Sequence, residues 1–178
     1  MFGEKYNENI LSDNADLCGV RTGAEDVGDI KENVLIYVKG TQSIDEWFEP
    51  VELVTPGFFG YRNGKCFVKY KETALTGMEG TTTTLTVDDN NRVVLMRSGE
   101  NNSQFIFEKG EHHVCVYETP YGEFSIGVRT GDISINIDER GGQIVAEYNL
   151  DIDNAAFSKN HFHIKIRELE TEDFNAGV

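Results

Sequence analysis

Cysteine is scarce in this chain and shows no organised pattern. The three cysteines, Cys18, Cys66 and Cys115, lie far apart, and none belongs to a C-x-x-C pair. An odd number of cysteines at such spacings argues against a disulfide framework. Cys66 and Cys115 lie in strand-like apolar runs and resemble small core residues. Because reduced thiols are typical of the cytosol, we expect a cytoplasmic protein.

Long apolar runs and an excess of positive charge are also missing. No segment approaches the roughly 18 apolar residues of a membrane-spanning helix. No basic stretch followed by an apolar one indicates a signal peptide. The chain has 16 Lys and Arg against 31 Asp and Glu, a net charge of -15. This charge repels nucleic acids and anionic membranes, so we expect neither as a partner. A basic protein partner is compatible with it, but the sequence identifies none.

Familiar catalytic and cofactor-binding motifs are absent. The sequence contains no G-x-S-x-G, H-E-x-x-H or G-x-G-x-x-G motif and no Walker-type phosphate loop. These absences disfavour the common hydrolases, nucleotide enzymes and oxidoreductases. We therefore infer no cofactor and favour a protein without catalytic activity.

The distribution of acidic residues divides the chain into three parts. Residues 1–30 contain seven acidic and two basic residues without a sustained apolar period, which predicts a flexible extension. A short helix over 14–20 is compatible with this segment. Residues 169–178 form a second acidic tail, and we expect 31–168 to form one domain.

The central part is rich in strand signals. Residues 69–87 predict two strands around a turn, because the second half is a threonine ladder and Gly77 and Gly80 permit the reversal. Alternation and turn residues mark eleven candidate ranges, from which we expect about nine or ten strands: 34–39, 51–54, 64–72, 81–88, 92–97, 104–109, 114–119, 123–129, 133–138, 144–152 and 161–167. Residues 153–160 suggest one helical turn.

Short connections between consecutive strands favour an up-and-down arrangement. A meander of this length must close or fold over, because open sheet edges promote aggregation. An antiparallel barrel of about eight to ten strands satisfies this requirement. A two-sheet sandwich is the competing solution, but a Greek-key sandwich needs longer crossovers.

Three segments carry a family resemblance: KETALTGMEGTTTTLTV, RSGENNSQFIFEKGEHHVCVYETPYGEFSIGVRT and YNLDIDNAAFSKNHFHIKI. They are similar to the YwiB-like family of uncharacterised bacterial proteins, which resembles the calycins, the lipocalin-type β-barrels. The resemblance covers about residues 31–168. It implies an all-β, calycin-like barrel and no established reaction.

The histidines and the acidic turn are weak candidates for a metal site. His161 and His163 share one strand face, but Lys165 and Arg167 share it too and would repel a cation. The segment 151–154 begins like a calcium loop but lacks the later oxygen ligands, so turn chemistry explains it better. We predict no metal.

Polar side chains on apolar strand faces suggest a ligand site inside the barrel. Arg97 shares a face with Val93 and Leu95 and would hold a carboxylate or phosphate through two hydrogen bonds. The full set of candidate ligand-binding residues is Arg97, Glu79, Gln104, Tyr117 and Tyr70.

Three functional hypotheses remain open at this point. The first is a binding protein for a small, amphipathic, anionic ligand. The second is a protein-interaction module that uses the acidic surface. The third is a small hydrolase or isomerase with Glu79 and Arg97 in its active site. The alternative to a site at Arg97 is that Arg97 and Glu79 simply satisfy each other as a structural ion pair.

Overall fold

The computed structural model describes residues 32–44, 47–100, 102–119, 122–152 and 155–169, and these residues form ten strands. The helical content of this described part is a single 3-10 turn, Ala74–Thr76, between β3 and β4. The strands are β1 (Val34–Ile44), β2 (Trp47–Arg62), β3 (Lys65–Lys71), β4 (Thr81–Val87), β5 (Val93–Gly99), β6 (Asn102–Phe107), β7 (His112–Thr119), β8 (Gly122–Asp138), β9 (Gly141–Ile152) and β10 (Ala155–Glu168).

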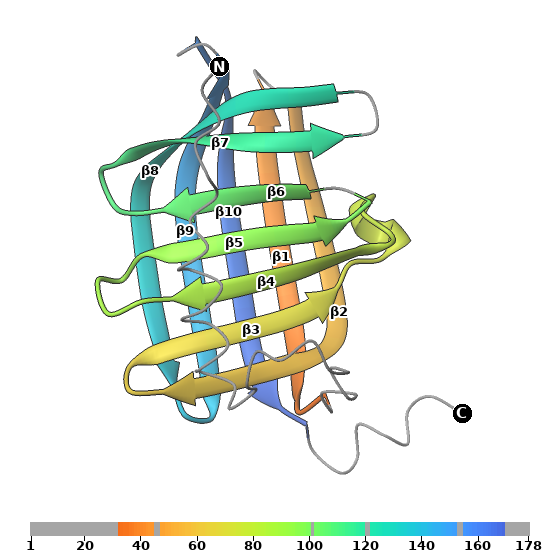
Figure 1. The fold of residues 1–178 in the computed structure, drawn as a ribbon, viewed down its shortest axis with the longest axis vertical. Helices are drawn as coiled ribbons and strands as arrows, with labels where there is room; N and C mark the ends of the chain where they lie inside the picture. Colours follow the sequence, from red (N-terminus) through yellow and green to blue (C-terminus); the bar gives the residue numbers. More distant parts are fainter. Residues whose placement is uncertain (1–31, 45–46, 101, 120–121, 153–154, 170–178) are drawn as a thin grey trace, which may run out of the picture.

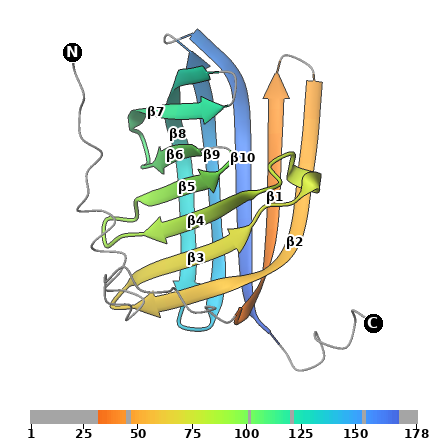
Figure 2. The same ribbon diagram turned by 45° about the vertical axis from the view of Figure 1, so that its right-hand side comes forward.

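Each strand pairs antiparallel with the next along the chain, and β1 pairs with β10 to close the barrel. The predicted all-β, up-and-down barrel is therefore confirmed. Figures 1 and 2 show that the barrel is flattened into two layers whose strands cross steeply. The layer of β3 to β7 covers the layer of β1, β8, β9 and β10. No described helix is long and apolar enough to span a membrane.

Two long strands connect the layers, and each has a glycine where it changes partner. β2 pairs with β1 up to Gly57 and with β3 from Gly57 onward. β8 pairs with β7 up to Arg129 and with β9 from Gly127 onward. At both positions a Cβ would collide with a neighbouring strand. The absence of a side chain therefore allows the strands to approach closely at the two corners.

The alternation of side chains predicted from sequence decides which residues form the core. In β4, Thr81, Thr83, Leu85 and Val87 are buried, and the residues between them are not. Inward residues of the other strands join them in one continuous apolar cluster, which includes Val68, Phe107 and Ile164. Burial of such side chains is the main stabilising contribution to a fold of this size.

Two expected elements differ from the structure. The ranges 123–129 and 133–138 belong to one strand, β8, whose register shifts between Thr130 and Asp132. The segment 130–132, which would be a turn between the two predicted strands, is thus a β-bulge within one strand. The expected helical turn over 153–160 is also wrong, because Ala155 onward pairs with β9. Most of the predicted acidic segments, residues 1–30 and 170–178, lie outside the described residues.

Candidate ligand-binding site

One end of the barrel interior is polar. Cross-strand pairing aligns Tyr70, Thr83, Arg97 and Ser103 in a single row across β3 to β6, and the row continues to Tyr117 in β7. Three predicted site residues therefore share this row: Tyr70, Arg97 and Tyr117. The side chain of Tyr117 lies outside the described part of the structure. Tyr70, Thr83 and Ser103 are buried, so their hydroxyl groups are removed from bulk water.

Arg97 is the central charged group of this row. Its side chain is 16% exposed, and its Nε lies 3.9 Å from Oε1 of Glu72, whose side chain is 3% exposed. The same carboxylate oxygen accepts a hydrogen bond of 2.5 Å from the Thr83 hydroxyl. The guanidinium also lies 5.9 Å from the centre of the Phe105 ring. A buried carboxylate and an aromatic face thus flank one cation.

The electrostatic influence of Arg97 extends across the barrel. Burial, with the nearby negative charge of Glu72, raises the pKa of Tyr70, and the positive charge of Arg97 opposes this shift. Burial also raises the pKa of Tyr148 in β9, and Arg97 again opposes the shift. The Tyr148 ring packs against the Phe107 ring, with the two ring centroids 4.8 Å apart. Both phenols therefore remain neutral hydrogen-bonding groups at physiological pH.

Two polar atoms of this row have no hydrogen-bond partner among the described residues. They are Nε of Arg97 and Oγ of Ser103, and both are buried. A buried polar group without a partner costs about 1–3 kcal/mol. Native proteins usually satisfy such groups with protein atoms, water or a bound molecule. Arg97 and Ser103 are thus two buried groups of this row that can each make one further hydrogen bond.

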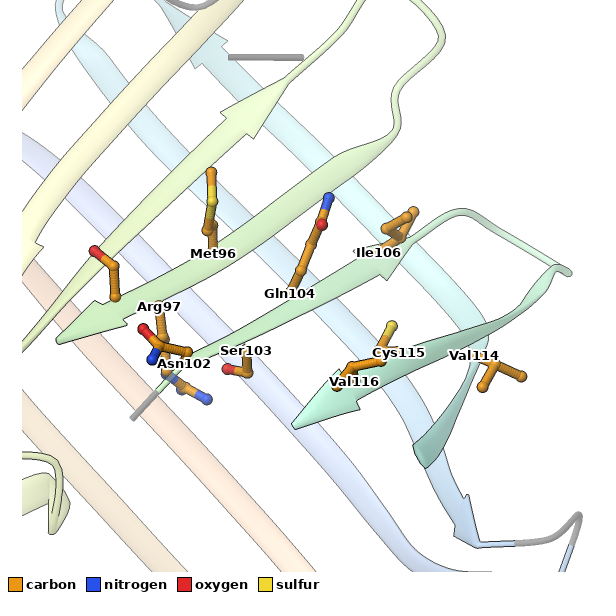
Figure 3. Close-up of a pocket in the computed structure, with 10 residues that line it drawn as sticks. Met96, Arg97, Asn102, Ser103, Gln104, Ile106, Val114, Cys115 and Val116 are labelled. Atoms are coloured by element: carbon orange, nitrogen blue, oxygen red, sulfur yellow. The ribbon is translucent and has the colours of Figure 1, made fainter. Parts of the chain in front are cut away.

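A pocket of about 430 Å³ opens beside this row, between β6 and β7. In Figure 3, Met96 and Gln104 point to one side of the strands, and Arg97 and Ser103 point to the other. The residues that line the pocket include members of both groups. Its lining residues are Met96, Arg97, Ser98, Asn102, Ser103, Gln104, Ile106, Val114, Cys115 and Val116.

The pocket exists because β6 and β7 separate. Their ladder consists of the pairs Asn102–Glu118 and Ser103–Tyr117 and stops there. The turn between them bonds to β8 instead: Gly110 N–H donates to the Thr130 carbonyl, and Thr130 N–H donates to the Glu111 carbonyl. The start of β7 therefore follows β8 and leaves a gap beside β6.

The thiol of Cys115 lies in this gap. Burial raises its pKa, and a hydrogen bond from the Ile106 backbone opposes this shift. The sulfur thus partly replaces the missing ladder contact between β6 and β7. A raised pKa leaves the thiol protonated and a poor nucleophile near neutral pH. We assign Cys115 a packing role.

Two of the predicted site residues lie elsewhere. Glu79 is exposed in the turn before β4, and the partner of Arg97 is Glu72. The expected Arg97–Glu79 pair is therefore wrong, and the hydrolase hypothesis loses its carboxylate. Gln104 lies on the outer face, because Ser103 and Phe105 occupy the inner positions of β6. Gln104 nevertheless lines the pocket from outside.

Glu72 is the member of this polar row's charge pair that sequence reasoning missed. It follows the inward-facing Tyr70 by two positions, so strand alternation places both on one face. The sequence signal was therefore available. It was obscured because Glu72 directly follows the last residue of β3, where charged residues are usually exposed.

His112 and His163 each pair with a different polar residue, and not with each other. His112 Nε2 lies 2.9 Å from Oδ2 of the buried Asp151, across Gly127. His163 lies on the outer face, 3.1 Å from Gln143. Asp151 is thus a buried partner of His112. The sequence had suggested only a turn at this position. The described residues contain no cluster of three or more His, Cys, Asp or Glu side chains suited to a metal ion.

The fold and the site define a ten-stranded antiparallel barrel with a partly polar interior. The chain belongs to the family described as a domain of unknown function, DUF1934, whose model matches residues 36–164. It is 25% identical over 130 residues to the uncharacterized beta-barrel protein YwiB of Bacillus subtilis, covering 73% of this chain and 87% of YwiB. The crystal structure of that ywiB protein matches with a TM-score of 0.69 and 22% identity, over 78% of this chain and 93% of the other. The expected relationship is confirmed.

Proposed function

We propose that this protein binds a small amphipathic ligand between β6 and β7, with an anionic head group held by Arg97. The observation that carries the proposal is the buried Nε of Arg97, which lacks a hydrogen-bond partner and belongs to a residue lining the pocket. Nε is a donor, and so is the unpartnered hydroxyl of Ser103. A ligand with several acceptor atoms would satisfy both groups.

The pocket has the composition of a small-molecule site. Such sites typically measure about 300–1,000 Å³ and combine apolar walls with a few polar groups. Here Met96, Ile106 and Val116 supply apolar contacts, and Gln104 adds an amide at the outer edge. An amphipathic molecule matches this division between apolar walls and a polar inner end.

The ion pair with Glu72 leaves Arg97 able to bind an anion. The 3.9 Å separation between Nε and Oε1 exceeds the usual hydrogen-bond range of about 2.7–3.2 Å. The Glu72 oxygen is already engaged by Thr83. A carboxylate or phosphate would therefore gain charge-assisted hydrogen bonds that Glu72 does not make. Barrels of this general shape often hold one small ligand, although the fold alone does not fix a function.

The test uses amphipathic probes that share one alkyl chain and differ in the head group: carboxylate, phosphate, amide or ammonium. We expect the two anions to bind in native mass spectrometry and to raise the melting temperature. A probe at about 100 times its Kd should stabilise the protein by about 2.7 kcal/mol. The variant Arg97→Met/Glu72→Gln should lose this stabilisation without leaving a buried unpaired charge.

Two further variants make the result specific. Ile106→Trp should fill the pocket and block binding while Arg97 stays intact. Lys39→Met removes an exposed cation of β1, which pairs with Glu52, and should bind like the wild type. The proposal fails if no anionic probe binds the wild type, or if Arg97→Met/Glu72→Gln binds every probe unchanged.

A further inference from the structure

A group of positive charges lies on the outer surface of β2 and β3 in this acidic protein. Lys65, Lys69 and Lys71 of β3 alternate with buried residues and point outward, and Arg62 of β2 is exposed. Cross-strand pairs join Arg62 to Lys65 and Phe58 to Lys69. We call these four cations, with Phe58 and Phe67, the basic face.

The charge of the basic face is poorly neutralised by the described residues. Lys65 lies 3.8 Å from Asp89, while the described part of the chain offers no ion pair to Arg62, Lys69 or Lys71. Glu72 is close in sequence but points into the barrel. Clustered cations without nearby anions produce a positive potential, which attracts an acidic partner.

The rest of this surface suits a polypeptide partner. The half-buried rings of Phe58 and Phe67 meet edge to face with centroids 6.0 Å apart, between the cations. Thr82, Thr84 and Thr86 present hydroxyl groups on the neighbouring strand β4. Apolar contacts and hydrogen-bond donors are thus combined with positive charge.

We propose that the basic face binds the acidic N-terminal segment of the same chain, residues 1–31. This segment interleaves Phe2, Tyr6, Ile10 and Leu11 with acidic residues. Its charged residues are Glu4, Glu8, Asp13, Asp16, Glu25, Asp26 and Asp29 against Lys5, Arg21 and Lys31. Its composition therefore complements both the cations and the aromatic rings of the basic face.

The position of Asn33 brings the segment to this surface. Asn33 N–H donates to the Gly57 carbonyl, and its side chain exchanges hydrogen bonds of 2.8 and 2.9 Å with the backbone of Phe59. Gly57 and Phe59 flank Phe58, which belongs to the basic face. The segment thus begins beside its binding surface, at an effective concentration on the order of millimolar. Weak attraction is sufficient under that condition.

The test uses the full-length chain with a nitroxide spin label on Cys18. The other two cysteines are buried, so the label should attach selectively. We expect paramagnetic broadening of the backbone amide signals of β3 and β4 and much weaker broadening in β7, at the other edge of this layer (Figure 1). Raising NaCl to about 0.5 M should reverse the broadening, because the Debye length falls to a few ångströms.

Matched charge reversals identify the surface. Lys69→Glu/Lys71→Glu should abolish the broadening, while Lys159→Glu/Lys165→Glu, at exposed positions of β10, should leave it unchanged. A mixture of spin-labelled and isotope-labelled chains should show no broadening between molecules. The proposal is overturned if β3 and β4 stay sharp, if the charge reversals act alike, or if the broadening arises between two copies.

Discussion

At the scale of single residues, the pair of Glu72 and Arg97 should contribute strongly to stability. Removing one member of a buried ion pair leaves the other charge without compensation, which typically costs about 3–5 kcal/mol. Because Arg97 retains some contact with solvent, we expect Glu72→Ala to lower the free energy of unfolding by about 2–3 kcal/mol. Urea unfolding measures this change.

An exposed ion pair provides the control. Lys39 and Glu52 approach to 2.7 Å, but both side chains are more than half exposed. Glu52→Ala should therefore cost less than about 1 kcal/mol. Equal losses in Glu72→Ala and Glu52→Ala would contradict a special role for the buried pair.

Cys66 should make stability depend on alkaline pH. Burial raises the pKa of its thiol from 9.0 to about 12. Above about pH 9 the unfolded chain loses this proton while the folded chain keeps it, so rising pH favours unfolding by up to about 1.4 kcal/mol per pH unit. Under reducing conditions, urea unfolding between about pH 9 and 10 should show a steeper loss in the wild type than in Cys66→Ala. Parallel curves would contradict this assignment.

Residue-level prediction succeeded where strand alternation was unambiguous. Tyr70 and Arg97 follow inward-facing apolar residues by two positions, and both lie on the inner face. Gln104 was expected on the inner face but lies on the outer one, because Phe105 and Phe107 occupy the inner positions of β6. Glu79 was misplaced because a turn has no period from which its direction can be inferred. Alternation indicates that Glu72 points inward, but its pairing with Arg97 depends on geometry across strands, which no local pattern contains.

At the scale of secondary-structure elements, the glycine at the corner of β2 should be difficult to replace. A Cβ at Gly57 would collide with Ile36 Cδ1 and lie 2.7 Å from the Lys69 carbonyl oxygen. The side chain can rotate away, but the carbonyl belongs to the β2–β3 ladder. We expect Gly57→Ala to cost about 2–3 kcal/mol by overpacking.

Gly40 in β1 offers a matched comparison, because a Cβ there would meet no atom within 4 Å. Gly40→Ala should leave stability unchanged or raise it by up to about 1 kcal/mol, since alanine restricts the unfolded chain. Thermal and urea unfolding of both variants measure the contrast. A Gly57→Ala protein as stable as Gly40→Ala would show that β2 can bend without a glycine.

Element boundaries were predicted less well than strand identity, for the same physical reason. Pro56-Gly57 in β2 and Thr130-Gly131-Asp132 in β8 have turn-like compositions, yet the chain continues through both as a strand. Bends and bulges use the same residues as turns, and only the partner strands distinguish them. The gap between β6 and β7 was likewise invisible in sequence, because it depends on the bonds from their turn to β8.

At the scale of the whole molecule, the architecture followed from one property of the sequence. Short connections between consecutive strands require each strand to pair with its neighbour, and closure removes the remaining edges. The structure adds one pairing between distant segments, that of β1 with β10. The amide of Leu169 donates to the Asn33 carbonyl at 3.1 Å, so the two ends of the barrel domain meet.

This closed order predicts that the chain tolerates circular permutation. Joining Val178 to Met1 and opening the chain between Asn90 and Asn91 makes β4–β5 the distant pair and β1–β10 a pair joined by a linker. One long-range pairing replaces another, so the mean sequence separation of contacts changes little. Because folding rates follow this separation, we expect the permutant to fold within about tenfold of the wild-type rate.

The opening site is chosen to preserve the barrel. Asn90 and Asn91 are exposed in the turn between β4 and β5, where their amides bond to Asp88. The terminal segments form the new linker, and the closure cost of such a loop grows only with the logarithm of its length. Stopped-flow refolding from urea, followed by fluorescence and circular dichroism, measures the rate. A slowing of about a hundredfold or more would show that the β4–β5 hairpin must form first, because that hairpin is the local contact the permutation removes.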